Sequence, residues 1–427
     1  MKQGTKIYNL IKLVWSYNRS LTGEGVRKTL AQFKKKNKDL KIFEVKSGTK
    51  CFDWQIPLEW IVEDAWIKNS TGKKIIDFKK NNLHLVGYSI PINEKFSLKK
   101  LLPYLHSLPL QKNAIPYVTS YYKKIWGFCL TDKQKKNLKK DTYHVNIKSK
   151  LKKGSLTYGE ILIKGKSNKE ILLSSYICHP SLANNELSGP CLLIYLSNWI
   201  KNIKNRHYSY RIIFIPETIG SIYYISKHLN KLKKNVKAGY VLTCVGDNRD
   251  ISYIPSRNEN TLSDIIAKHV LKKSNYKFKK YSWLDRGSDE RQFCAPGVDL
   301  PIASVIRSKY GNFKEYHTSL DKLDTVVTKK GLDKSFEIYT KIIDALENNQ
   351  VYKNKFLCEP KLDKYNLYPS LSMKNNKSKS TIKIKNLLTY FDGKLDLISI
   401  CDKLDLSIWD VKEEVKKLIE NDLIRKI

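Results

Sequence analysis

His179 follows an apolar run at residues 171–178 and is itself followed closely by Asn185 and Glu186. Imidazole nitrogens and the oxygens of amide and carboxylate side chains are common ligands of divalent metal ions. The segment therefore has the composition of half a metal-binding site. The alternative is a capped loop that contains a histidine and binds nothing, and this segment alone does not distinguish the two interpretations.

Further apolar runs downstream end at residues of similar chemistry. The runs and the residues that follow them are 211–216 with Glu217, 238–245 with Asp247, and 300–306 with Arg307, Tyr316, His317 and Asp321. Apolar runs of this length without helical periodicity predict buried strands. In α/β sheets the catalytic and ligand groups collect at the carboxyl ends of the strands. We therefore expect an α/β fold in which these side chains meet at one edge of a sheet.

The order of these motifs resembles that of the co-catalytic zinc aminopeptidases. The matching residues are His179, Asn185-Glu186-x-Ser188-Gly189, Pro216-Glu217-x-x-Gly220, Ser288-Asp289 and His317-Thr318-x-x-Asp321. The resemblance implies zinc ions at the strand ends of a mixed sheet that lies between layers of helices.

Longer motifs resemble a bacterial family described as polysaccharide biosynthesis proteins with an aminopeptidase-like domain. They lie at residues 47–54, 115–122, 126–129, 286–293 and 315–319, so the resemblance covers nearly the whole chain. It implies a mixed-sheet core of the zinc-peptidase type, which is also called phosphorylase/hydrolase-like. It further implies a role in a polysaccharide or glycan pathway, which no single residue of the chain demonstrates.

The chain departs from the zinc aminopeptidases at metal-binding positions. The aspartate that bridges both metals in those enzymes corresponds to Asn185, whose amide offers an oxygen but no charge. The neighbouring Glu186 could replace it as a ligand if the loop is turned by one residue. Where those enzymes carry two consecutive glutamates, this chain has Glu217-Thr218. Glu217 keeps the position of the general base, and Thr218 replaces a zinc ligand.

The remaining carboxylate ligand of those enzymes falls near Thr243, with Asp247 as a nearby replacement. His179 and His317 are therefore the ligands that remain. Either residue of the pair 185–186 would complete the three protein ligands that are common at catalytic zinc. We expect one zinc ion rather than two.

If one zinc ion binds, Glu217 would take the proton of the attacking water and return it to the leaving amine. The alternative is that Glu217 is an acid at a helix N-terminus, where the helix dipole favours it. The residues expected to contact the substrate are Asp289, Glu290, Arg307, Tyr316 and Tyr121. Asp247 and Asp321 are expected to support the metal ligands from behind. The structural alternatives are helix and turn caps for the acids, an ion pair for the arginine and an aromatic core for the tyrosine.

The chain has 427 residues, a formal net charge of +38 and a pI near 9.7. Such a charge favours polyanionic partners, but arginine, which binds phosphate in a bidentate manner, is scarce beside lysine. We therefore attribute the charge mainly to compositional bias and do not expect a nucleic-acid partner; an acidic glycan would fit equally well. The 8 cysteines lack a CxxC pair, which predicts reduced thiols. We expect a cytoplasmic protein without membrane insertion.

Changes in composition divide the chain into segments. Residues 1–50 are expected to begin the peptidase-like domain, 51–150 to form an inserted β-rich domain, 151–360 to complete the core, and 380–427 to form a winged helix-turn-helix after a linker at 361–379. The candidate recognition helix, residues 408–419, carries acids and lysines in near balance. We therefore favour a docking or homo-oligomerisation module over DNA binding.

Three functions from different classes fit these observations. The first is a zinc-dependent hydrolase that cleaves an amide bond of a peptide or of an amino-acid/sugar conjugate. The second is a catalytically inactive, aminopeptidase-like binding or scaffold protein. The third is a nucleic-acid-associated regulator, for which binding to duplex DNA would depend steeply on salt. Retention of His179, Glu217 and His317 favours the hydrolase over the scaffold protein, whereas the loss of carboxylates at positions 185 and 218 favours the scaffold protein.

Overall fold

A computed structural model of the chain describes residues 2–368 and 379–427. These residues form two compact units, of which the first contains the described residues up to Ser263 together with Phe278–Glu337, and the second contains Asp264–Lys277 and the described residues from Ile338 onward. Residues 369–378 of the expected linker lie outside the described residues. The segment 51–150 belongs to the first unit.

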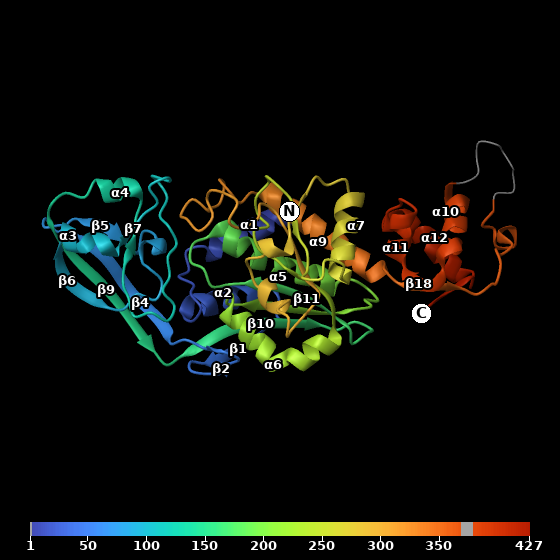
Figure 1. The fold of residues 1–427 in the computed structure, drawn as a ribbon, viewed down its shortest axis with the longest axis horizontal. Coiled ribbons are helices and arrows are strands. Elements are labelled where there is room, and N and C mark those ends of the chain that lie inside the picture. Colours follow the sequence, from blue (N-terminus) through green and yellow to red (C-terminus); the bar gives the residue numbers. More distant parts are fainter. Residues whose placement is uncertain (1, 369–378) are drawn as a thin grey trace. The chain divides into compact units, whose positions relative to one another are not determined.

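The centre of the first unit is an eight-stranded mixed sheet (Figure 1). In spatial order its strands are β1 (Lys41–Lys46), β10 (Ser155–Ile163), β12 (Ser209–Ile215), β11 (Glu170–Tyr176), β13 (Val236–Val241), β16 (Ile302–Ile306), β14 (Ser252–Ile254) and β15 (Lys279–Lys280). The neighbours β12 and β11, β11 and β13, and β13 and β16 pair in parallel. Their carboxyl ends therefore lie at one edge of the sheet, as the sequence predicts.

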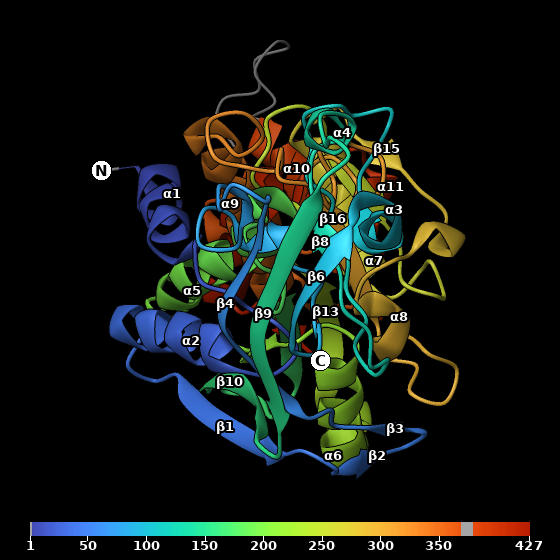
Figure 2. The same ribbon diagram turned by 90° about the vertical axis from the view of Figure 1, so that its left-hand side faces the viewer.

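The parallel strands are buried throughout, because helices cover both faces of the sheet. Figures 1 and 2 show α5 (Ser188–Lys201) and α6 (Ile219–Asn235) on opposite sides of the strands. Two further helices, α1 (Gln3–Val14) and α2 (Glu24–Lys36), pack against α5. A short helix, α8 (Glu290–Phe293), contacts α6 and β16.

The apolar runs of the sequence overlap the observed strands, but the strand ends differ by a few residues. β11 ends at Tyr176 and β13 ends at Val241, before the predicted ends at residues 178 and 245. The chain leaves each strand early because these residues form the loops that carry the polar groups of the site. Their apolar side chains stay buried there: Ile177, Leu242 and Val245 are fully buried outside any strand.

Within residues 51–150 the chain forms a four-stranded antiparallel sheet in the order β5-β4-β9-β6. The elements of this region are β2 (Lys50–Cys51), β3 (Trp54–Gln55), β4 (Glu59–Lys68), β5 (Lys74–Asp77), β6 (Ile92–Ser97), α3 (Leu98–Leu101), β7 (Leu105–His106), β8 (Phe128–Cys129), α4 (Asp132–Lys136) and β9 (Thr142–Lys152). A loop between β7 and β8 reaches the segment that follows β16, since the amide of Tyr117 donates a hydrogen bond to the carbonyl of His317 at 2.8 Å.

The second unit contains the C-terminal module. Its elements include parts of α7 (Leu262–Lys273) and α9 (Lys329–Asn348), followed by β17 (Val351–Asn354), α10 (Lys379–Tyr390), β18 (Asp392–Asp396), α11 (Leu397–Lys403), α12 (Ile408–Glu420) and β19 (Ile424–Lys426). The strands form a sheet in the order β18-β17-β19. Ser407 and Asp410 form a capping box at the start of α12, where the sequence predicts a helix start. The module therefore includes β17, which precedes residue 380.

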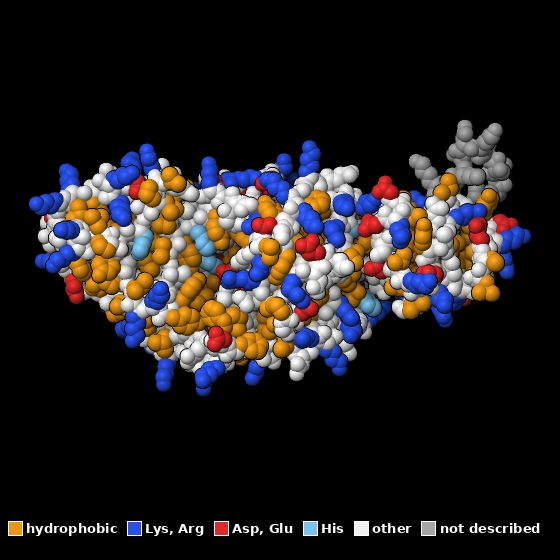
Figure 3. Space-filling view, viewed as in Figure 1, with side chains coloured by type: hydrophobic (Ala, Val, Ile, Leu, Met, Phe, Trp, Pro, Cys, Tyr) orange, Lys and Arg blue, Asp and Glu red, His pale blue; other side chains and the backbone are white. Residues whose placement is uncertain are grey.

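Lysine and arginine side chains are spread over the face shown in Figure 3 and do not gather in one patch. Among the described residues, no helix has the length and apolar character needed to cross a bilayer. All 8 cysteines are free thiols, and only Cys358 is exposed.

Candidate active site

His179 lies at the carboxyl end of β11, and its two ring nitrogens face different surroundings. Nδ1 lies 2.8 Å from Oε2 of Glu186, which is hydrogen-bond distance. Nε2 lies 3.7 Å from Oε2 of Glu217, which is beyond that distance. The side chains of His179 and Glu186 are almost completely buried. Glu186 therefore lies behind the imidazole, and Glu217 lies in front of it.

The loop after His179 forms a π-helical turn, Ala183–Leu187, that runs directly into α5. Asp321 holds this turn, because its carboxylate accepts hydrogen bonds from the amides of Asn184 at 2.7 Å and Asn185 at 2.8 Å. Asp321 thus caps backbone groups rather than a histidine ring. Burial raises the pKa of Asp321 to about 7.

Gly189 is required where the turn meets the sheet. A Cβ atom at this position would lie 2.2 Å from the carbonyl oxygen of Leu242 and 2.5 Å from Oγ of Ser175. The Ser188-Gly189 motif therefore reflects the close approach of α5 to β11 and to the loop after β13. Ser188 also contributes, since its hydroxyl accepts a hydrogen bond from the amide of Val245.

Arg19 is a member of the site that sequence reasoning missed. Its guanidinium is completely buried, and Nε donates a hydrogen bond to the carbonyl of His179 at 2.9 Å. Nη1 donates to the carbonyl of Val14 at 2.6 Å, and Nε lies 3.8 Å from Oε1 of Glu186. Burial raises the pKa of Glu186 and lowers that of Arg19, while each charge opposes the shift of the other.

His317 lies opposite His179, with 5.4 Å between the ring centroids. Its ring stacks on Tyr316 at 3.9 Å, and the ring of Tyr117 contacts both histidines edge-on at 5.0 and 5.3 Å. His317 has a φ of 53°, a backbone conformation that bulky residues rarely adopt. Burial lowers the pKa of each histidine to about 3, helped by Arg19 for His179 and by His179 for His317. Both imidazoles are therefore neutral and can coordinate a metal ion.

Glu217 follows β12 and precedes α6, which begins at Ile219. Its amide donates a hydrogen bond to Sγ of Cys178 at 3.2 Å, and its side chain remains 19% exposed. Burial raises the pKa of Glu217 well above its usual value, and the charge of Asp289 raises it further. Thr218 has a φ of 65°, so the turn that presents Glu217 is strained.

Asp289 and Glu290 are completely buried. Oδ1 of Asp289 accepts hydrogen bonds from the amide of Thr218 and the hydroxyl of Ser221, both at 2.8 Å, and so supports the strained turn. Oε1 of Glu290 accepts hydrogen bonds from Gly287, Ser288 and Tyr310. The second oxygen of each carboxyl group, Oδ2 and Oε2, is buried without a hydrogen-bond partner. The expected contact with substrate remains a prediction for these oxygens.

Asn185 faces a cluster of neutral groups. Its backbone carbonyl accepts hydrogen bonds from the hydroxyl of Tyr176 at 2.6 Å and from that of Thr243 at 2.8 Å. Its side-chain Oδ1 accepts a hydrogen bond from Tyr176 at 3.2 Å, and its Nδ2 is buried without a partner. Thr243 therefore takes part in a hydrogen-bond network where the zinc aminopeptidases are expected to carry a carboxylate.

The structure does not bring Asp247 and Arg307 to the histidines through any described hydrogen bond. The carboxylate of Asp247 accepts hydrogen bonds from Ser308, Arg249 and Asn184, and Nε of Arg307 donates to the backbone carbonyl of Asp247. These residues fix the loop after β13. Tyr121, by contrast, is 36% exposed.

Among the described residues, one group of potential metal ligands meets within 4.8 Å: Cys178, His179 and Glu186. The guanidinium of Arg19 lies 3.8 Å from Glu186 and already supplies positive charge on this side of the ring. A metal ion is therefore better accommodated on the Nε2 side of His179, toward His317 and Glu217.

A mixed sheet between helices, with histidines and acids at its carboxyl-end edge, defines the aminopeptidase-like class of α/β proteins. The chain is similar to a zinc aminopeptidase from Bacillus subtilis, with a TM-score of 0.58 and 13% identity over 80% of this chain and 94% of that chain. It is also similar to a peptidase M28 precursor from Shewanella amazonensis, with a TM-score of 0.56 and 11% identity over 83% and 95%. At these identities the comparisons show the fold alone.

Higher similarity is found to proteins of Clostridium acetobutylicum. A crystal structure of a candidate peptidase from this organism has a TM-score of 0.93 and 42% identity, covering 99% of this chain and 96% of that chain. A candidate polysaccharide biosynthesis protein with an aminopeptidase-like domain is 42% identical over 425 residues, which is 99% of this chain and 97% of the relative.

Residues 8–349 match a family described as a domain of unknown function, DUF4910, and residues 350–426 match a winged helix-turn-helix family. The chain belongs to the DUF4910 family and carries a C-terminal winged helix-turn-helix. The expected fold class and family are confirmed.

Proposed function

We propose that this chain is a hydrolase that cleaves an amide bond and binds one zinc ion at the carboxyl-end edge of the sheet. The observation that carries the proposal is the asymmetry of His179. Its Nδ1 is held by Glu186, and its Nε2 faces Glu217 across 3.7 Å with His317 beside it.

The donor groups on the Nε2 side suit one zinc ion. His179 and His317 are neutral imidazoles, and the amide of Asn185 is the candidate for a third ligand. Because the oxygen and nitrogen of an amide can be exchanged by a flip, Asn185 can present an oxygen where its unpartnered Nδ2 now lies.

A bound zinc ion would polarise the substrate carbonyl and lower the pKa of a water ligand. Glu217 would accept the proton of the attacking water and pass it to the leaving amine. Burial raises the pKa of Glu217, which makes its carboxylate a stronger base toward this proton. Tyr316 and Tyr121 are proposed to border the substrate, and the strained turn at Thr218, supported by Asp289, would hold Glu217 in place.

One ion is proposed rather than two because the positions that would hold a second ion carry neutral groups. Asn185, Thr218 and Thr243 bring no negative charge, and two dications that lie close together repel each other unless carboxylates lie between them. Glu186 does not compensate for this loss, because it contacts Nδ1 of His179 and the guanidinium of Arg19.

The substrate class is proposed as a peptide or an amino-acid/sugar conjugate. The amide bond follows from the aminopeptidase-like fold, and the sugar follows from the description of the Clostridium acetobutylicum relative. We also propose cytoplasmic localisation.

The second candidate function is a binding or scaffold protein without catalysis. It is favoured by the network of Tyr176, Asn185 and Thr243, whose neutral groups satisfy one another where metal ligands would be required. The proposals differ in one property that is measured directly, namely metal binding.

The test is zinc content by elemental mass spectrometry, combined with a screen of aminoacyl amides and aminoacylated sugars. We expect about one zinc per chain, lost in His179→Ala and in His317→Ala. A matched control is His144→Ala, since His144 is half-buried on β9 and contacts Asn93 and Trp66, which are not residues of the site. If the wild-type protein binds no zinc and cleaves no amide, the scaffold function replaces the hydrolase.

For the C-terminal module we propose docking rather than DNA binding. In helix-turn-helix proteins the first residues of the recognition helix contact the bases. Here the amide of Ile408 donates a hydrogen bond to Nε2 of His269 at 3.0 Å. The indole of Trp409 donates to Asp344 at 2.9 Å. The start of α12 is therefore engaged within its own unit.

A further inference from the structure

Behind His179, on the side away from Glu217, lies a buried ion pair formed by Arg19 and Glu186. We infer that this pair is a positioning device, which fixes His179 with its proton on Nδ1 and its lone pair on Nε2. The inference rests on the proposed function, because it assigns the pair a role toward the same zinc ion.

The hydrogen bond between Nδ1 and Glu186 selects the tautomer of His179. When Glu186 is ionised, a state that the neighbouring guanidinium of Arg19 favours, its carboxylate only accepts hydrogen bonds, and the contact of 2.8 Å then places the proton on Nδ1. The other nitrogen, Nε2, then carries the lone pair. Metal-binding histidines commonly donate their second N–H to a carboxylate or carbonyl group, which orients the ring and makes it more basic. Glu186 therefore acts through His179 and does not itself touch the metal ion.

Arg19 completes the device in two ways. Its charge offsets that of Glu186, and a buried carboxylate requires such a partner. Its Nε also donates to the backbone carbonyl of His179, so the same guanidinium holds both the backbone of the histidine and the carboxylate behind the ring. One side chain thereby fixes the position and the orientation of His179.

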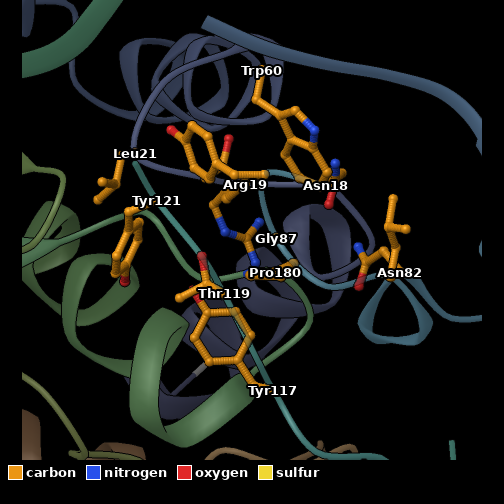
Figure 4. A pocket seen from close by; sticks show the side chains of 13 residues that line it. Asn18, Arg19, Leu21, Trp60, Asn82, Gly87, Tyr117, Thr119, Tyr121 and Pro180 are labelled. Atoms are coloured by element: carbon orange, nitrogen blue, oxygen red, sulfur yellow. The ribbon is translucent and has the colours of Figure 1, made fainter. Parts of the chain in front are cut away.

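The surroundings of Arg19 exclude a role in binding substrate. Figure 4 shows its side chain running through the middle of a set of lining residues that includes Tyr117 and Tyr121. The cavity that these residues line has a volume of about 10 Å³. This is room for about one water molecule. The guanidinium is completely buried, so a substrate cannot reach it.

The first unit contains a second buried pair that serves as a matched control. Arg211 donates hydrogen bonds to Glu170 at 2.6 and 2.8 Å, and both side chains are nearly inaccessible. The partners described for this pair do not include a histidine. A change that breaks it disturbs a buried charge in the same sheet and leaves His179 untouched.

The experiment is 15N NMR of the histidine rings in zinc-free protein at neutral pH, together with zinc affinity by competition with a chelator dye. The variants are Glu186→Gln, which keeps the shape and an acceptor, the double variant Arg19→Met with Glu186→Leu, and Glu170→Gln as the control. The signals of His179 are assigned with His179→Ala.

We expect wild-type His179 to carry its proton on Nδ1. In the double variant the Nε2–H tautomer should appear, and the Kd for zinc should rise by roughly 10- to 100-fold. Glu186→Gln should give a smaller change in the same direction, and Glu170→Gln none. A wild-type ring protonated on Nε2, or a double variant with unchanged tautomer and affinity, overturns the inference. If wild-type protein binds no zinc, the proposed function fails, and the tautomer measurement still decides whether the pair positions His179.

Discussion

Two buried histidines, one in each unit, both contact a carboxylate through Nδ1 but differ in what lies at Nε2. His179 contacts the carboxylate of Glu186 through Nδ1 at 2.8 Å, and His269 contacts that of Asp402 through Nδ1 at 2.7 Å. The second nitrogen of His269 accepts a hydrogen bond from the amide of Ile408 at 3.0 Å. The second nitrogen of His179 has only Glu217 in front of it, at 3.7 Å.

This comparison separates a structural histidine from a candidate ligand. The side chain of His269 is completely buried, both of its nitrogens are bonded, and the ring ties α7 to the start of α12. His179 is buried to a similar degree, yet its Nε2 has no described hydrogen bond and faces Glu217 across 3.7 Å. Burial and a carboxylate partner are therefore common to both histidines, and only the state of the second nitrogen indicates function.

The largest expected effect concerns the group in front of His179. Glu217→Gln removes the base and keeps the shape, so the kcat/KM for a cleavable amide should fall by roughly 10²- to 10⁴-fold. Zinc content should stay at the wild-type level. If the substitution removes zinc instead, Glu217 is a metal ligand, and Nε2 of His179 faces a second ligand rather than a general base.

The next effect concerns His269. His269→Ala leaves the amide of Ile408 without its acceptor in a buried position, so the free energy of unfolding should fall by about 1–3 kcal/mol. Zinc content and activity should be unchanged. Urea unfolding followed by circular dichroism measures the stability. A loss of zinc in this variant would contradict the assignment of His269 as structural.

A pH-dependent effect is expected from Asp289, which supports the turn that carries Glu217. Burial raises the pKa of Asp289 to about 6, whereas the unfolded chain should show about 3.9. Between pH 4 and 6 the folded state binds more protons than the unfolded state, so stability falls as the pH rises.

Asp289→Asn removes this titration. The free energy of unfolding of the wild type minus that of the variant should therefore decrease between pH 4 and 7, by about 1–3 kcal/mol. Urea unfolding at a series of pH values measures the difference. A difference that stays constant over this range would show that burial does not raise the pKa of Asp289.

The smallest effect is expected on the surface of the second unit. Lys416 is exposed on α12 and lies 3.9 Å from Glu420. If α12 does not read DNA, Lys416→Glu should change the affinity for a random duplex by less than about twofold and leave the salt dependence unchanged. Fluorescence anisotropy at several salt concentrations measures both. A drop in the salt slope by about one would assign a phosphate contact to Lys416.

The parallel strands of the sheet could be predicted in outline because buried parallel strands consist of continuous apolar runs. The run at 211–216 corresponds to β12 and that at 300–306 to β16. The helices of the C-terminal module could be predicted from their caps, such as Ser407 before α12. The strand β17 could not, because its four residues pair only with strands that lie far along the chain.

The proximity of His179, Glu217 and His317 follows from the parallel strands, which end at the same edge. The direction of Glu186 does not follow, because a π-helical turn decides which way each side chain of the 183–187 segment points. The sequence around Arg19 contains nothing that predicts its place in the site. The residue follows a helix in an ordinary sequence context, and its partner His179 lies 160 residues farther along the chain.

That separation has a consequence for the order in which the protein assembles. A ribosome adds about 5–20 residues per second, so the 160 residues between Arg19 and His179 correspond to about 8–30 s of synthesis. During this time α5, against which α1 packs, has not been synthesised, and the guanidinium of Arg19 stays hydrated. We therefore expect α1 to dock late and to cover the Arg19 side of the site after the strands have formed.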